Sequence, residues 1–579
     1  MNFKEQNRNM KRPWVNYYPS ASIAELEYPD GTMYDAFRSA ALQNPDNAAI
    51  DYMNVKMTFR ELHQEVLRCA AALQALGAKR GDRITVCLPN IPQAVIAFYA
   101  ILYIGAQANM IHPLSAGNEI EFYVNTSKST ILFMFDAFFG KLQGIRCPTL
   151  QTVVFAGAAD LLPFYLRAGF RLTQGRKIKK PQENDSVLSW NAFLGKYRKA
   201  ALTDDFGASG IQCTDTAVIL YSGGTTGIQK GILLSHLNFN ALAQQTAANG
   251  TQSILPEDTM LAVLPMFHGF GLGVCIHTAI AKGVTIILVP RFDADSFAEL
   301  LRKKKPSFIA GVPTLYEALL RGDRLKDVDF SGVKGVFSGG DTLPPDVKLR
   351  FDAALKERGA NVTLREGFGL TECVTASALT PAGEYRRGSV GIPYSDTFYK
   401  ITAPGQMEEL PPDTDGEICI SGPTVMNGYL DNPEETAKVL RIHADGRLWL
   451  HTGDLGSMDA DGFVYFKSRI KRMIKCSGYS VYPSQVEDVL NSHEAVSISC
   501  VIGVHDDYKM NRLKAFIVLK DGTEATQAVR DSILQYCREK VARYAVPKEF
   551  VYRESLPLTK VGKVAYTVLE QEEMTKNVR

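Results

Sequence analysis

Short apolar runs that alternate with longer amphipathic segments extend through most of this 579-residue chain. In segment 57–77 the apolar residues recur every three or four positions, which predicts a helix that stops at Gly77. Runs of strand length follow at 83–88, 130–135, 152–155, 217–221, 285–289, 308–310 and 333–337. Strands separated by helices are the pattern of a doubly wound α/β sheet, which is therefore the predicted core of the chain.

The pattern changes twice toward the C-terminus. After about residue 393, strands separated by tight turns predict a small β-barrel-like piece attached to the large domain. From 484 onward, two strands and two helices predict a small α+β domain. Because a chain of this length is expected to form two or more domains, we predict an N-terminal domain over 1–470 and a C-terminal domain over 471–579.

Composition narrows the class of protein. The chain is 46% apolar and 22% charged, as globular proteins are, and its net charge of +2 gives no global attraction for nucleic acid. Ten cysteines without a Cys-x-x-Cys pair suggest reduced thiols rather than disulfides or a zinc site. Segment 1–11 is too polar for a signal peptide, so we expect a cytoplasmic protein. Segment 94–111 contains Gly105, Gln107 and Asn109 and predicts a buried helix running into a strand, not a membrane span.

Segment 161–180 differs from the rest of the chain. It mixes aromatic and aliphatic residues with six Arg or Lys residues and has no Asp or Glu. Two interpretations stay open, a solvated basic loop beside a short helix and a peripheral contact with a membrane surface.

Residues 221–231 form a loop crowded with glycines and hydroxyl side chains. Glycines let backbone N–H groups approach an anion, hydroxyls donate hydrogen bonds, and a lysine supplies a point charge, so the loop is predicted to bind phosphate. The predicted contacts are Ser222, Gly223, Gly224, Thr225, Thr226, Gly227 and Lys230.

This loop is not a Walker A motif. Lys230 is followed by Gly231 instead of Ser or Thr, and the glycine spacing differs from the Walker pattern. Apolar residues stand on both sides of the loop, which predicts strand-loop-strand where a Walker loop would open a helix. A P-loop kinase is therefore disfavoured.

The loop resembles the phosphate-binding signature of the adenylate-forming superfamily, which includes acyl-CoA synthetases, aryl-CoA ligases, beetle luciferases and peptide-synthetase adenylation domains. Other motifs of that superfamily follow in order, and the resemblance covers about 33–566. It implies ATP, Mg²⁺ and coenzyme A as the small molecules that the chain uses.

Two segments resemble the motifs around the acyl group and the adenine. Segment 264–271 is similar to the motif that lines the acyl pocket and places His268 and Phe270 near the acyl chain; Gly311 and Val312 are assigned to the same substrate site. Segment 338–343 resembles the loop along the adenine ring. Its cofactor residues are Gly339, Gly340 and Asp341, the last at a position where alanine is common.

Segment 366–372 is similar to the motif that holds the nucleotide and the metal. By this resemblance Phe368 stacks on adenine, Gly369 and Thr371 contact the nucleotide, with Thr371 on the α-phosphate, and Glu372 binds Mg²⁺. The chemistry agrees, because Mg²⁺ prefers hard oxygen ligands and takes one or two carboxylates beside phosphate.

Segment 451–456 resembles the motif in which Asp454 accepts both ribose hydroxyls, and Arg469 matches an arginine that also reaches the ribose. Lys471 matches the family hinge. The loop that swings into the site for thioester formation is assigned to Lys475, Ser477, Gly478 and Tyr479.

Segment 556–564 resembles the motif carrying the adenylation lysine, which is Lys563. The resemblance implies that the acid attacks the α-phosphorus of ATP, pyrophosphate leaves, and the thiol of coenzyme A then displaces AMP. Rotation about Lys471 would present Lys563 for the first step and the Lys475 loop for the second. The catalytic residues assigned in this way are Lys563, Thr226, Glu372 and Lys475.

The nature of the acid follows from one absence. Amino-acid adenylation domains usually keep an aspartate soon after the acyl motif, but here the first aspartate after Pro265 is Asp293. An uncharged apolar acid is therefore predicted, either a medium- or long-chain fatty acid or, in place of it, an aryl acid. The predicted pocket residues are Phe267, Phe270, Leu272, Val312 and Val374.

Two alternatives to an acyl-CoA synthetase are considered. In one, a separate acyl carrier protein replaces coenzyme A as the acceptor. In the other, the chain is a nucleotide-binding adaptor without catalysis, since a fold alone does not fix a function. The intact residues Glu372, Asp454, Arg469 and Lys563 argue against the adaptor.

Overall fold

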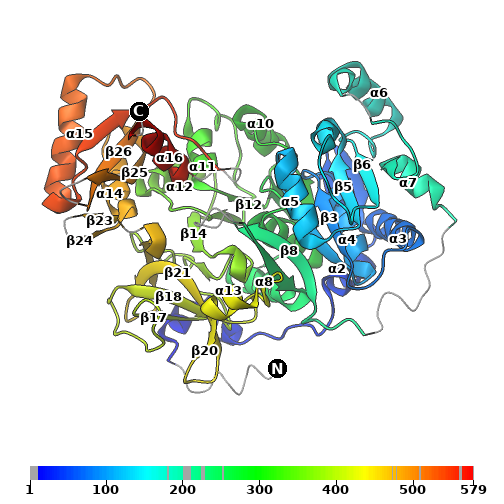
Figure 1. Cartoon of the computed structure of the whole chain (residues 1–579), viewed down its shortest axis with the longest axis horizontal. Coiled ribbons are helices and arrows are strands. Elements are labelled where there is room, and N and C mark those ends of the chain that lie inside the picture. The colour runs from blue at the N-terminus through cyan, green and yellow to red at the C-terminus, as the bar shows by residue number, and fades with distance from the viewer. Residues whose placement is uncertain are drawn as a thin grey trace.

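The computed structural model describes residues 11–178, 181–199, 210–222, 229–250, 253–472, 474–476, 479–506, 510–559 and 564–577. Two large sheets form the body of the molecule (Figure 1). The eight-stranded sheet has the order β19 (Gly428–Tyr429), β9 (Lys230–Ser235), β8 (Thr216–Ser222), β4 (Gln107–Met110), β3 (Arg83–Cys87), β5 (Ile131–Phe135), β6 (Thr152–Ala156) and β7 (Val187–Ser189).

The nine-stranded sheet carries the later apolar runs of the sequence. Its order is β16 (Ile392–Pro393), β15 (Ala378–Leu379), β14 (Leu364–Phe368), β13 (Gly335–Ser338), β12 (Phe308–Gly311), β10 (Thr259–Ala262), β11 (Thr285–Leu288), β1 (Ala48–Tyr52) and β2 (Val55–Thr58). All pairings from β14 through β1 are parallel. Both sheets are thus mainly parallel at their centres, and the predicted doubly wound α/β architecture is confirmed.

Helices cover both sheets. They are α2 (Met33–Gln43), α3 (Phe59–Ala75), α4 (Pro92–Tyr103), α5 (Gly117–Ser127), α6 (Phe164–Leu172), α7 (Trp190–Lys196), α8 (His236–Gly250), α9 (Ala279–Ala281), α10 (Ala294–Lys304), α11 (Pro313–Leu320) and α12 (Pro345–Glu357), with the π-helical turn η5 (Phe270–Thr278).

Helices α3 and α4 follow the sequence pattern closely. Thr58 and Glu61 form a capping box that starts α3, and Gly77, at φ +89°, follows its end. Helix α4 is buried at every position because it packs between α3 and strands β3 and β4, and the chain then continues into β4. No helix in the described residues combines the length and the apolar composition needed to cross a membrane.

A smaller antiparallel sheet follows the second large sheet. Its five strands are β17 (Phe398–Thr402), β18 (Gly416–Ser421), β21 (Leu448–Met458), β20 (Leu440–Ile442) and β22 (Val464–Arg469), with α13 (Pro433–Val439) beside it. Strand β21 pairs with β18, and it also pairs with β20 through its first residues and with β22 through its last. The pairings leave edge strands, so the piece predicted as barrel-like is an open sheet in the part of the chain described.

The C-terminal residues build a separate small unit at one end of the molecule, coloured orange to red in Figure 1. Its elements are β23 (Ile474–Cys476), β24 (Tyr479–Val481), α14 (Pro483–Asn491), β25 (Val496–Asp506), β26 (Met510–Leu519), α15 (Gln527–Lys540), β27 (Glu549–Tyr552) and α16 (Tyr566–Asn577). Two apolar clusters within this unit contain no residue of the large sheets. The predicted α+β character is confirmed.

Candidate active site

Three of the predicted motifs meet at the carboxyl edge of neighbouring parallel strands. Gly311 at the end of β12 pairs with Ser338 at the end of β13, and Ser338 pairs with Glu366 in β14. The loops that leave these strands therefore start side by side. This edge is where open parallel sheets place ligands, which agrees with a nucleotide site at this position.

The loop after β13 lies against the start of η5. A Cβ added to Gly339 would approach Phe270 Cε1 to 3.2 Å, and Gly340 has φ +86°. Both positions therefore favour glycine, for close packing and for backbone conformation respectively. Phe270 is buried, and His268 Nδ1 accepts a hydrogen bond from the Phe270 N–H at 3.3 Å. The predicted adenine loop and the predicted acyl residues thus lie in contact.

The turn that carries Glu372 has an unusual backbone. Val374 and Thr375 both have positive φ, 54° and 65°, a conformation that β-branched residues rarely adopt. A Cβ on Gly369 would lie 2.5 Å from the Thr375 carbonyl carbon, so this glycine lets the turn fold back on β14. Strain of this kind is typical of functional sites, where surrounding structure holds it in place.

Phe368 ends β14 and faces other aromatic rings. Its ring centroid lies 5.8 Å from that of Phe466 and 6.5 Å from that of Tyr399. Thr371 is buried in the 3-10 turn that follows, beside half-buried Glu372. An aromatic ring held in this way presents a rigid flat surface suited to stacking on a base.

The phosphate loop connects an antiparallel pair, as the strand-loop-strand prediction required. Ser222 at the end of β8 pairs with Lys230 at the start of β9. The other predicted contacts in this loop, Gly223, Gly224, Thr225, Thr226 and Gly227, lie outside the described residues.

Lys230 and Glu372 are linked through residues that the sequence motifs did not indicate. Lys230 Nζ pairs with Glu435 Oε2 at 2.5 Å and lies 4.8 Å from the centre of the Tyr429 ring. The Tyr429 hydroxyl in turn donates a hydrogen bond to Glu372 Oε1 at 3.0 Å. Hydrogen bonds from Lys230 and Lys438 lower the pKa of Glu435 to about 2, so its carboxylate stays charged.

Asp454 and Arg469 are brought together by strand register. They pair directly across β21 and β22, and Arg469 Nε lies 2.9 Å from Asp454 Oδ1. The Asp454 side chain is 1% exposed and that of Arg469 is 42% exposed. The Asp454 carboxylate raises the pKa of Arg469, so the guanidinium is always charged. This pair presents one carboxylate and several N–H donors, which suits hydroxyl groups of a sugar.

Glu417 supports the turn that contains Asp454. Its two carboxylate oxygens accept hydrogen bonds from the Gly453 N–H at 3.1 Å and from His451 Nδ1 at 2.9 Å. His451 Nε2 lies 3.0 Å from His443 Nε2, so a buried polar chain runs away from the site. Sequence reasoning missed Glu417 because it lies on β18, more than thirty residues before the motif it supports.

Glu366 is a second carboxyl that the motifs did not assign. It is buried and accepts a hydrogen bond from the Leu343 N–H at 2.9 Å, which ties the end of the adenine loop to β14. Burial raises the pKa of Glu366 to about 8. Asp488 of α14, in the small C-terminal unit, interacts electrostatically with the exposed Asp341.

The remaining predicted residues are described in part. Lys471 lies in the turn η7 (Ile470–Arg472), and Lys475 and Tyr479 lie on the paired strands β23 and β24. Ser477, Gly478 and Lys563 lie outside the described residues. Val312 precedes α11, at the same sheet edge as Gly311.

The architecture is that of an adenylate-forming enzyme. It combines two mainly parallel sheets, a glycine-rich hairpin, motif loops gathered at one sheet edge and a small C-terminal α+β unit. The model of the AMP-binding enzyme family matches residues 37–430, and that of the AMP-binding enzyme C-terminal domain matches 485–563. The chain belongs to the AMP-binding enzyme family.

Full-length relatives agree with this assignment. A long-chain-fatty-acid–CoA ligase of Bacillus subtilis (strain 168) is 35% identical over 570 residues, covering 97% of this chain and 98% of that protein. A protein of the same name from Salmonella typhimurium is 31% identical, with coverage of 97% and 98%. The structure of the anthranilate CoA ligase AuaEII with anthranoyl-AMP shares the fold, with a TM-score of 0.82, 24% identity and coverage of 96% and 100%.

These relatives confirm the predicted class, an AMP-forming acyl-CoA synthetase. ATP, coenzyme A and a small carboxylic acid fit this family as substrates.

Proposed function

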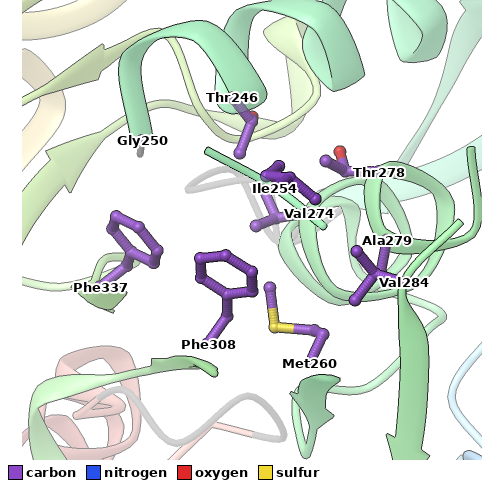
Figure 2. A pocket seen from close by; sticks show the side chains of 10 residues that line it. All are labelled: Thr246, Gly250, Ile254, Met260, Val274, Thr278, Ala279, Val284, Phe308 and Phe337. Carbon is purple, nitrogen blue, oxygen red and sulfur yellow. The ribbon is translucent and has the colours of Figure 1, made fainter. Parts of the chain in front are cut away.

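We propose that the chain joins a long-chain fatty acid to coenzyme A through an acyl-adenylate, with release of AMP and pyrophosphate. One observation carries the nature of the acid: an apolar cavity is lined by residues of α8, η5 and strands of the nine-stranded sheet (Figure 2). It is lined by Thr246, Gly250, Ile254, Met260, Val274, Thr278, Ala279, Val284, Phe308 and Phe337.

The cavity shares η5 and β13 with the motifs predicted to hold the acyl group and the adenine, although none of the predicted acyl residues lines it. Phe337 directly precedes Ser338 and the adenine loop, and Val274 lies one turn after Phe270 in η5. The surfaces that face the cavity are apolar, so it offers no partner for an amino group or a second carboxylate. An apolar tail is the chemistry that fits such a lining.

The cavity is narrow. Its volume is about 30 Å³, so a long tail can enter only if lining side chains move. Phe308 and Phe337 lie side by side below Gly250 in Figure 2, and rotation of these rings would lengthen the cavity. The relatives named long-chain-fatty-acid–CoA ligases favour a long fatty-acid tail over an aryl acid.

In the proposed site Glu372 would hold Mg²⁺. The fit is chemical: Glu372 supplies a hard carboxylate oxygen, and the hydrogen bond from Tyr429 fixes its direction near Lys230. When bound, Mg²⁺ would neutralise charge on the phosphate oxygens. Phe368 would stack on adenine, Asp454 and Arg469 would hold the ribose, and Ser222 to Lys230 would surround the phosphates.

The domain boundary at 470/471 also belongs to this proposal. Arg469 is paired with Asp454 of the large domain, whereas Arg472 pairs with Glu487 of α14 at 2.5 Å and lies 4.6 Å from the centre of the Tyr566 ring. Only Ile470 and Lys471 separate these two anchored arginines, which supports Lys471 as the hinge.

The experiment that tests the function measures AMP and pyrophosphate release from the purified chain. ATP and Mg²⁺ are supplied with fatty acids of 6 to 18 carbons, aryl acids and amino acids, each with and without coenzyme A. We expect release that requires coenzyme A and Mg²⁺ and is fastest with long-chain acids. If the chain forms the adenylate but no acyl-CoA, and transfers the acyl group to an added phosphopantetheine carrier protein, then the carrier protein is the acceptor in place of coenzyme A. If no acid causes release of AMP or pyrophosphate, a nucleotide-binding adaptor is favoured.

Filling the cavity should shorten the preferred acid. A Cβ on Gly250 would lie 3.5 Å from Phe337 Cζ, an ordinary contact, so Gly250→Leu would direct its branch into the space between the rings. We expect kcat/KM for a 16-carbon acid to fall roughly tenfold or more while that for a 6- or 8-carbon acid changes little, since lost methylene burial is worth about 1–3 kcal/mol. Gly250→Ala is the matched control and should leave the chain-length profile nearly unchanged. Equal losses for all chain lengths in a folded Gly250→Leu protein would place the tail elsewhere.

A further inference from the structure

Helix α6 exposes large apolar side chains to solvent. Phe164 is 78% exposed, Tyr165 70% and Leu172 65%. Exposed apolar residues are normal when scattered singly, but these three lie within one nine-residue helix. A cluster of exposed apolar side chains of this kind is typical of a surface that binds another molecule or a membrane.

The exposed residues share one face of α6. Phe164, Ala168 and Leu172 are spaced by four, so they lie in one row along the helix, and Tyr165 lies beside that row. Phe170 lies on the opposite side of the helix and packs, together with Leu161 and Leu162 before α6, against the main apolar core. The helix is therefore anchored to the protein by one side and turns its other apolar face outward.

The same segment is basic. Helix α6 and the following turn η4 (Gln174–Lys177) contain Arg167, Arg171, Arg176 and Lys177 and no Asp or Glu. Arg176 is exposed and Arg167 half-buried. Arginine and lysine beside exposed aromatic rings are the combination found on helices that lie in the headgroup region of a bilayer.

Helix α6 lies at the outer edge of the molecule, beyond β6 and far from the C-terminal unit (Figure 1). We propose that this face, which presents Phe164, Tyr165 and Leu172 on a basic segment, docks the enzyme on a membrane surface that contains anionic lipid. Positive charge complements the headgroups and the three apolar side chains enter the interface. The inference does not depend on the identity of the acid, because it concerns binding of the protein itself.

The test uses the full chain and sedimentation with vesicles, without substrates. We expect binding to vesicles of phosphatidylcholine with about 30% phosphatidylglycerol, weaker binding to phosphatidylcholine alone, and a decrease as salt is raised. The double variant Phe164→Ser/Leu172→Ser should lower the partition coefficient at least tenfold. Leu42→Ser/Leu349→Ser is the matched control, since these side chains are 64% and 62% exposed elsewhere, and it should bind like the wild type.

Two further results would overturn the proposal. One is vesicle binding that the α6 variant and the control lose equally, which would indicate general stickiness. The other is a wild-type dimer in analytical ultracentrifugation that dissociates in the Phe164→Ser/Leu172→Ser variant while neither protein binds vesicles, which would make the face a contact between copies of the chain. The variants should keep adenylation activity on a soluble short-chain acid, so failure of vesicle binding is separable from failure of the enzymatic proposal.

Discussion

Replacing Lys563 with alanine should abolish formation of the acyl-adenylate and leave thioester formation from supplied acyl-adenylate nearly intact. The proposed lysine neutralises charge that develops on the phosphate oxygens only in the first step, and removing one such group typically costs about 10²–10³-fold in rate. The measurement is pyrophosphate release for the first half-reaction and acyl-CoA formation from synthetic acyl-AMP for the second.

Lys560→Ala is the matched control, because it removes the same charge from the same motif three residues earlier. It should retain both half-reactions. Equal loss of both half-reactions in Lys563→Ala would mean that the lysine stabilises the structure or serves both steps, and the assigned division of labour would be wrong.

Asp454→Asn should weaken the use of ATP far more than it weakens the fold. The change keeps the shape of the side chain but removes the charge that pairs with Arg469 and is proposed to accept the ribose hydroxyls. We expect kcat/KM for ATP to fall roughly 10²-fold, equivalent to about 2.7 kcal/mol. The loss of stability should stay below the roughly 3–5 kcal/mol found for fully buried pairs, since Arg469 is 42% exposed.

Glu487→Gln provides the comparison, because it breaks the corresponding pair of Arg472 on the other side of the proposed hinge. Both variants should lower the melting temperature, but only Asp454→Asn should raise the ATP concentration needed for pyrophosphate release. If both variants raise the ATP concentration needed for pyrophosphate release to the same extent, Asp454 has only a structural role.

The parts of this fold that the sequence predicted are those whose cause is local. Helix α3 is set by its apolar spacing, its capping box and Gly77, and the predicted apolar runs coincide with strands β3, β5, β6, β8, β11, β12 and β13. The hairpin around the phosphate loop was predictable because apolar strands flank it on both sides.

Residues that act through tertiary pairing were not predictable in this way. Tyr429 reaches Glu372 because the two-residue strand β19 pairs with β9, and Glu417 reaches Gly453 because β18 pairs with β21. Neither contact leaves a periodic pattern in the sequence. The residues that line the cavity were not predictable from local sequence either. They come from α8, η5 and several strands, whereas the acyl motif predicted pocket residues close to η5.

The two arginines beside the proposed hinge also bear on how the enzyme would alternate between its steps. With the proposed boundary at 470/471, each is paired with a carboxylate on its own side, so rotation through Ile470 and Lys471 would leave both ion pairs intact. Contacts across the interface include Arg321 to Asp521 at 4.0 Å and Lys520 to Asp346 at 3.7 Å, partly exposed pairs worth at most about 1 kcal/mol each. If a second orientation lies close in free energy, bound substrates can select between the two, because a ligand shifts such an equilibrium by its difference in affinity for the two states. In this design the order of the half-reactions would be set by site occupancy, and the protein would need no separate device to switch between them.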